Sequence, residues 1–127
     1  MEHRVYQTNR ISFFEYEFFS EGPKGNIRKR IKFSKSLRHD DMVELSLLDV
    51  DIYGNFSDTN ISNNNDHDII FNTVAITVLN FSKDIPGKHI FFVGSTPGRN
   101  RLYRMTLSKK MKELENDFEF FGLLDGA

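Results

Sequence analysis

The sequence contains no cysteine and no tryptophan, and it has no hydrophobic run long enough to cross a bilayer. Without cysteine the chain forms no disulfides and performs no thiol chemistry, which suits a reducing compartment. Residues 1–7 lack the apolar stretch of a signal peptide. We therefore expect a cytoplasmic protein with no membrane partner.

Hydrophobic residues make up 39% of the 127 residues, which is enough for one compact core. Phenylalanine dominates the aromatic residues, with 13 Phe against 4 Tyr. Phenyl rings pack in offset or edge-on pairs, so the core should be rich in such pairs. The length predicts a single domain over residues 1–127.

The charges are sorted into blocks that each lack one sign. Residues 24–38 and 88–112 each hold seven Lys or Arg and no acid, whereas residues 40–82 hold eight acids and no Lys or Arg. The net charge is nonetheless only −1. Either neighbouring elements carry opposite charges that pair with each other, or the two positive blocks form a basic face for a polyanion or an acidic partner.

Two alternating segments near the N-terminus predict a hairpin. Residues 12–20 place Phe14, Tyr16 and Phe18 on one face of a strand. Residues 27–33 form the second strand, and residues 21–26 supply the glycine and proline of a turn. The second strand carries Ile27, Lys29, Ile31 and Phe33 on one face and Arg28, Arg30 and Lys32 on the other.

A third strand is predicted over residues 42–52, where Leu47 and Leu48 break the alternation and indicate a bulge. Residues 54–65 contain five Asn and no periodicity, so they are interpreted as a polar loop. Asn65 or Asp66 then caps a helix.

The stripe of that helix is spaced at steps of three and four and ends before Pro86 and Gly87. It consists of Ile70, Val74, Val78, Phe81 and Ile85. Because residues 74–78 are rich in β-branched side chains, a strand is the alternative, but the length of the stripe favours a helix.

The rest of the chain predicts a strand over residues 89–93, a helix over residues 97–116 and a short strand over residues 118–123. The inner stripe of the second helix is Tyr103, Leu107, Met111 and Leu114. The fold class is therefore α+β: a three-stranded antiparallel meander followed by two crossover units, in the order βββαβαβ.

This order resembles the front of the ribonuclease H-like fold, whose nucleases carry an essential Asp on the first strand. Here that strand offers only Glu15 and Glu17. The resemblance therefore does not bring nuclease activity with it.

The candidate site is the segment from Gly94 to Arg104, which follows a predicted buried strand and opens the second helix. Pro97 suits the first helical position after a cap at Ser95 or Thr96. Free amides at such a turn, beside three arginines, can receive an anion. The predicted anion-binding residues are Gly94, Ser95, Thr96, Gly98, Arg99, Arg101 and Arg104.

Arg99 lies about 40° from Tyr103 around the helix, on the side that faces the sheet. An inward guanidinium needs a partner. The partner is either an acid such as Asp49, Asp51 or Glu17, or the anion of a ligand.

Catalytic motifs are missing: the turn fits neither a Walker A loop nor a nucleophile elbow. Asp49 and Asp51 could join Asp66, His67 and Asp68 in a divalent-metal site. Their positions are better explained as strand-end charges and helix capping. The sequence thus predicts no metal and no cofactor, and it identifies no catalytic residue.

Two segments carry a family resemblance: residues 16–25, Tyr-Glu-Phe-Phe-Ser-Glu-Gly-Pro-Lys-Gly, and residues 94–104, Gly-Ser-Thr-Pro-Gly-Arg-Asn-Arg-Leu-Tyr-Arg. They resemble a family of small bacterial proteins known only as a domain of unknown function. The resemblance covers most of the chain and includes the three arginines of the turn. It implies no activity, cofactor or partner, but it supports the importance of the turn.

The leading hypothesis is a non-enzymatic binding or interaction module for an anionic ligand or an acidic protein partner. Arg99, Arg101 and Arg104 would bind it, with help from Arg28 and Arg30. Nucleic acid is a weaker alternative, because the net charge is not basic and binding would have to fall steeply with salt.

Two further hypotheses come from different classes. A small enzyme acting on a phosphorylated or nucleotide-like substrate would hold phosphate at residues 94–98 and a metal at Asp49 and Asp51. A homodimer would pair through an edge strand of the hairpin in residues 13–33.

Overall fold

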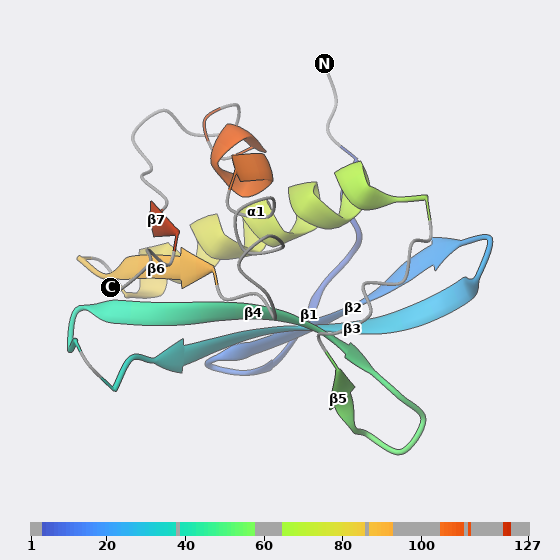
Figure 1. Ribbon diagram of the computed structural model, residues 1–127, viewed down its shortest axis with the longest axis horizontal. Helices are drawn as coiled ribbons and strands as arrows, with labels where there is room; N and C mark the ends of the chain where they lie inside the picture. The colour runs from blue at the N-terminus through green and yellow to red at the C-terminus, as the bar shows by residue number, and fades with distance from the viewer. Residues whose placement is uncertain are drawn as a thin grey trace.

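A computed structural model shows one mixed sheet with a long helix across one face (Figure 1). The structure describes residues 4–37, 39–57, 65–85, 87–92, 105–110, 112 and 121–122. The strands are β1 Asn9–Ser12, β2 Glu15–Gly22, β3 Gly25–Lys35, β4 Met42–Val50, β5 Phe56–Ser57, β6 His89–Phe92 and β7 Phe121–Gly122. The helix α1 is His67–Asp84, and residues 105–110 are also helical.

The sheet order is β1-β2-β3-β4-β6-β7, and β5 pairs with β4 outside this path. Strands β2, β3 and β4 form the predicted antiparallel meander. Strand β6 is parallel to β4, and β7 is parallel to β6, as crossover connections require. The α+β class is therefore confirmed.

The order βββαβαβ is not confirmed, and neither is the ribonuclease H-like order, because two short strands are added. The predicted strand 12–20 is interrupted by a turn at residues 13–14, so that β1 folds back along β2. The Arg10 guanidinium donates to the carbonyls of Ser12 and Phe13, which stabilises this turn. Strand β5 lies within residues 54–65, which the sequence predicts to be a polar loop.

The predicted hairpin has continuous register from Glu15↔Lys32 to Gly22↔Gly25. Gly25 has φ +83°, the conformation that glycine adopts most readily. The predicted bulge at Leu47 and Leu48 is wrong, since β4 pairs with β3 without a register shift. Leu47 faces the core and Leu48 is half-buried on the other face, so two adjacent leucines fit a regular strand.

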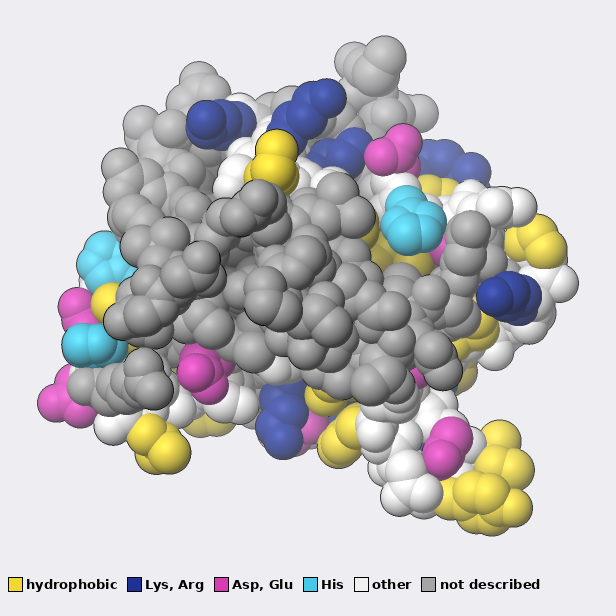
Figure 2. Space-filling model, viewed as in Figure 1, with side chains coloured by type: hydrophobic (Ala, Val, Ile, Leu, Met, Phe, Trp, Pro, Cys, Tyr) yellow, Lys and Arg dark blue, Asp and Glu magenta, His cyan; other side chains and the backbone are white. Residues whose placement is uncertain are grey.

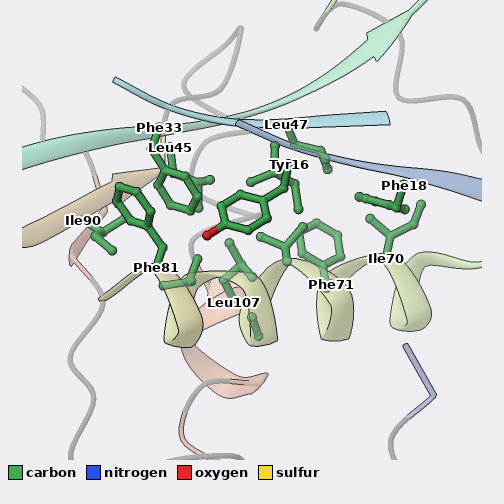
Figure 3. Close-up of a cluster of buried hydrophobic side chains, with 14 of the residues drawn as sticks. Tyr16, Phe18, Phe33, Leu45, Leu47, Ile70, Phe71, Phe81, Ile90 and Leu107 are labelled. Atoms are coloured by element: carbon green, nitrogen blue, oxygen red, sulfur yellow. The ribbon is translucent and has the colours of Figure 1, made fainter. Parts of the chain in front are cut away.

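The core lies between the sheet and α1 (Figure 3). Ile70, Val74, Val78 and Phe81 of α1 are buried, which confirms the helical stripe. Phe33 of β3 stacks on Phe81 with ring centroids 3.8 Å apart and planes at 9°. Leu107 joins this core from residues 105–110, as its predicted inner position requires.

Asp66 occupies the predicted N-cap position of α1, but its side chain makes no capping hydrogen bond. Its Oδ2 instead accepts hydrogen bonds from Tyr6 Oη at 2.6 Å and Ser20 Oγ at 2.5 Å. The Asp66 carboxylate thereby joins the N-terminal segment, β2 and the start of α1. Within the described part of the chain, no helix is long and apolar enough to cross a membrane.

Candidate functional site

All seven predicted anion-binding residues lie outside the described residues. They are Gly94, Ser95, Thr96, Gly98, Arg99, Arg101 and Arg104. The anion-binding turn therefore stays a prediction. Arg28 and Arg30, the two auxiliary arginines, are described and lie on the sheet face opposite α1, which we call the outer face.

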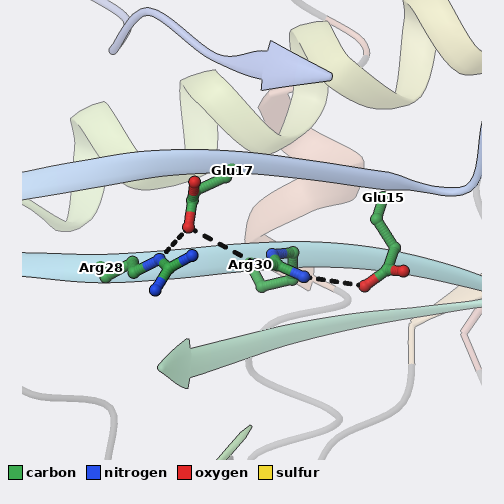
Figure 4. Close-up of polar contacts among 4 residues, drawn as sticks. All are labelled: Glu15, Glu17, Arg28 and Arg30. Carbon is green, nitrogen blue, oxygen red and sulfur yellow. Dashed lines mark hydrogen bonds and ion pairs between the residues drawn. The ribbon is translucent and has the colours of Figure 1, made fainter. Parts of the chain in front are cut away.

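Four side chains of the outer face form a ladder of alternating charge between β2 and β3 (Figure 4). Arg30 Nη1 lies 3.0 Å from Glu15 Oε1, and Arg30 Nη2 lies 3.5 Å from Glu17 Oε1. Arg28 Nε donates to the same Glu17 oxygen. Adjacent strands thus carry opposite charges that pair, which confirms this interpretation of the basic block for these two arginines.

Burial distinguishes the two arginines. The Arg30 side chain is 11% exposed, as is that of Glu17, so this part of the ladder is largely shielded from water. The Arg28 side chain is 41% exposed and uses only Nε in its ion pair. The remaining N–H groups of Arg28 can therefore bind another acceptor, because a guanidinium presents five donors.

The β4–β5 hairpin brings Phe56 over the end of this ladder. Its ring centroid lies 5.4 Å from Arg30 Cζ and 5.7 Å from Lys32 Nζ. Both distances suit a cation–π contact. The ring is nevertheless 46% exposed, so it also contributes apolar surface to the outer face.

An open groove of about 720 Å³ separates the β2–β3 hairpin from the β4–β5 hairpin. Its apolar lining comes from Phe19, Ile27, Val50 and Ile52. Glu17, Asn26, Arg28 and Asp51 supply the polar lining. The groove therefore combines apolar side chains with the exposed guanidinium of Arg28.

The β4–β5 hairpin projects from the body of the protein (Figure 1), and hydrophobic side chains gather at its tip (Figure 2). Ile52 is 90% exposed and Tyr53 is 83% exposed. Phe19 also has an exposed side chain on the outer face. Apolar side chains grouped on a projecting element mark an interaction site more often than isolated ones do.

The acids proposed for a metal site are engaged elsewhere. Asp49 pairs with the fully buried Lys29 on the core side of β3 and β4. Asp51 accepts hydrogen bonds from the backbone N–H groups of Asn55 and Tyr53. These hydrogen bonds hold the pKa of the Asp51 carboxyl below its usual value, and the bond from the Asn55 backbone contributes most. Among the described residues, no group of three or more potential ligands is placed to hold a metal.

Sequence reasoning missed the groove and Phe56. The sequence nevertheless contains a signal for the β4–β5 hairpin, since a Gly-Asn turn flanked by hydrophobic residues is typical of a hairpin. Here Gly54 and Asn55 lie between Ile52 and Phe56. Gly54 indeed has φ +84° and closes the turn. The neighbouring Asn-rich stretch concealed this short hairpin.

These features define a small α+β protein with an outer sheet face that no described helix covers. The chain belongs to the family of unknown function DUF6934, whose model matches residues 2–127. This confirms the predicted membership of a domain family without an assigned function. No curated protein and no solved structure matches the chain.

Proposed function

We propose that this protein is a non-enzymatic interaction module that binds a protein partner on the outer face. The observation that carries the proposal is the groove of about 720 Å³ beside exposed Phe19, Ile52 and Phe56. A partner side chain in this groove would bury apolar surface on both proteins, which is the main favourable term in association. The aromatic residues border the groove, and aromatic side chains are enriched at the centres of protein interfaces.

The charge of the outer face determines what else the partner needs. Arg30 is held by two glutamates, so it adds little to the field outside. Arg28 retains free donors at the groove, and a carboxylate of the partner can accept from them. The proposed partner segment therefore combines an apolar anchor with an acidic residue.

The turn in residues 94–104 is a second binding element of the same module. Its proposal rests on the three arginines and on the amides expected after residue 93. We also propose that the protein is bacterial, on the basis of the family resemblance, and that it acts in the cytoplasm, on the basis of its lack of cysteine. The alternative of a small enzyme has less support, because Asp49 and Asp51 bind Lys29 and a local turn respectively.

Site-specific crosslinking tests the outer-face proposal. A photoreactive residue at position 52 is introduced in cells that express the protein naturally, and the crosslinked protein is identified and purified. Phe19→Ser and Ile52→Ser should each weaken its binding about tenfold, as loss of an apolar anchor does. Leu37→Ser is the control, because Leu37 is fully exposed and lies outside the groove.

The proposal fails if crosslinks from positions 37 and 52 capture the same proteins, since the groove would then have no selectivity. It also fails if Leu37→Ser weakens binding as much as Ile52→Ser. Thermal melting of all three variants shows whether each retains its fold.

A further inference from the structure

A second cavity, of about 300 Å³, lies where β3, β4 and β6 meet the C-terminal end of α1. We call it the end pocket. Its apolar lining is Phe14, Met42, Val43 and Ile85. The volume is at the lower end of the range for small-molecule sites, roughly 300–1,000 Å³.

Two lysines at the end pocket provide positive charge. Lys35 is the register partner of Val43, so its side chain lies on the core side of β3, beyond Phe33. Lys88 Nζ donates to the Asp40 carbonyl oxygen at 2.6 Å, which leaves two of its N–H groups available. Neither lysine forms an ion pair with a described residue.

Backbone hydrogen bonds hold the walls of the pocket in place. Phe33 N donates to Phe14 O at 2.8 Å, and His89 N donates to Asp41 O at 2.8 Å. Arg10 bridges the turn at Phe13 to Asp84 near the end of α1, with an ion pair of 3.0 Å. The pocket is therefore formed before a ligand enters, which lowers the entropic cost of binding.

Asp40 also lines the pocket, so the lining contains one acidic residue beside the two lysines. Two ammonium groups and one carboxylate leave a net charge of +1 on the lining. A single negative charge on the ligand balances this net charge, whereas the two negative charges of a phosphate monoester exceed it.

We propose that the end pocket binds a small organic monocarboxylate. The apolar body of the ligand contacts Phe14, Met42 and Ile85, and its carboxylate accepts hydrogen bonds from Lys35 and Lys88. The site is distinct from the outer face, since the two cavities share no lining residue. The inference therefore does not depend on the proposed function.

Titration with 3-phenylpropanoate, followed by backbone amide NMR shifts, tests the proposal on the unmodified protein. We expect saturable shifts at Val43 and His89 and none at Phe19 and Ile52 of the outer face. The neutral isostere 3-phenylpropanamide should bind about tenfold more weakly, because it lacks the charge that the lysines recognise.

Lys35→Met and Lys88→Met should each weaken binding of 3-phenylpropanoate about fivefold, since Met keeps an apolar stem but removes the charge. Lys83→Met is the matched control: Lys83 is exposed near the end of α1 but does not line the pocket. Equal binding of the acid and the amide would overturn the proposal. So would the absence of saturable shifts in the unmodified protein, which needs no variant to fold.

Discussion

Tyr6 joins three parts of the chain through one hydroxyl and one amide. The hydroxyl donates to Asp66 and accepts from the backbone N–H of Glu21 at 3.1 Å. The Tyr6 amide donates to Thr73 Oγ1 of α1 at 2.8 Å, and the ring stacks on Phe18 with centroids 5.7 Å apart. A half-buried side chain near the N-terminus thus stabilises the start of α1.

The same contacts predict how stability depends on pH. Burial first, and then the hydrogen bond to Asp66, raises the pKa of Tyr6 above 10.0. The folded protein therefore keeps the Tyr6 proton at a pH where the unfolded chain loses it. The contribution is fully present below pH 10 and is lost as the pH rises through the folded pKa.

We predict that Tyr6→Phe lowers the free energy of unfolding by about 2 kcal/mol at neutral pH, because the hydroxyl loses its hydrogen bonds with the Asp66 carboxylate and the Glu21 amide. It should also reduce the loss of stability above pH 10. Urea denaturation from pH 7 to pH 11 measures both effects. Tyr53→Phe is the control, because Tyr53 is 83% exposed; an identical alkaline profile for Tyr6→Phe and the unmodified protein would contradict the prediction.

At the scale of elements, β3 and β4 form the centre of the sheet, and each carries a charged residue toward the core. Lys29 and Asp49 are register partners, and Lys29 Nζ donates to Asp49 Oδ1. The Lys29 side chain is fully buried, whereas that of Asp49 is 20% exposed. Such a pair needs both members, because a lone buried charge is costly.

We predict that Lys29→Met destabilises the protein by about 3 kcal/mol, since it leaves the Asp49 carboxylate without its ammonium partner. The double variant Lys29→Met, Asp49→Leu should recover most of this loss, because it removes both charges. Chemical denaturation of the two single variants and the double variant gives the coupling free energy. Additive effects of the two substitutions would show that the ion pair contributes nothing.

At the scale of the whole molecule, the positive charge is already largely compensated. Net charge is −1, and Arg28 and Arg30 pair with acids on the neighbouring strand. The described outer face therefore presents no basic stripe of the kind that nucleic acid binds.

Strand β2 is paired on both sides, by β1 and β3, so it is not the edge strand that the predicted homodimer would use. The homodimer itself stays a prediction.

We predict that duplex DNA and RNA bind only weakly at about 150 mM salt, where surface charges are screened beyond about 8 Å. Fluorescence anisotropy over a series of salt concentrations measures this. Tight binding with a steep salt dependence would contradict the prediction and would point to residues 94–104. In that case Arg99→Lys should weaken binding more than Arg101→Lys, because a bidentate guanidinium site does not accept an ammonium.

The sequence by itself determined those elements whose signals are local. The alternation of β2 and β3 placed Tyr16 and Phe18 on the core side, and the spacing of three and four placed Val74 and Phe81 on the buried side of α1. Such periodicities depend only on backbone geometry, so they survive without knowledge of the fold.

The tertiary structure alone decided which distant groups meet. Alternation placed Lys29 on the apolar face of its strand, but only the register of β3 against β4 identified Asp49 as its partner. Likewise, the usual capping preferences predict that the Asp66 side chain accepts a hydrogen bond from its own helix. In the structure it accepts one from Tyr6, 60 residues away. A buried carboxylate takes the strongest donors within reach, and those are set by how the elements pack. The groove and the end pocket have the same origin, because each is lined by residues that only the packed sheet brings together.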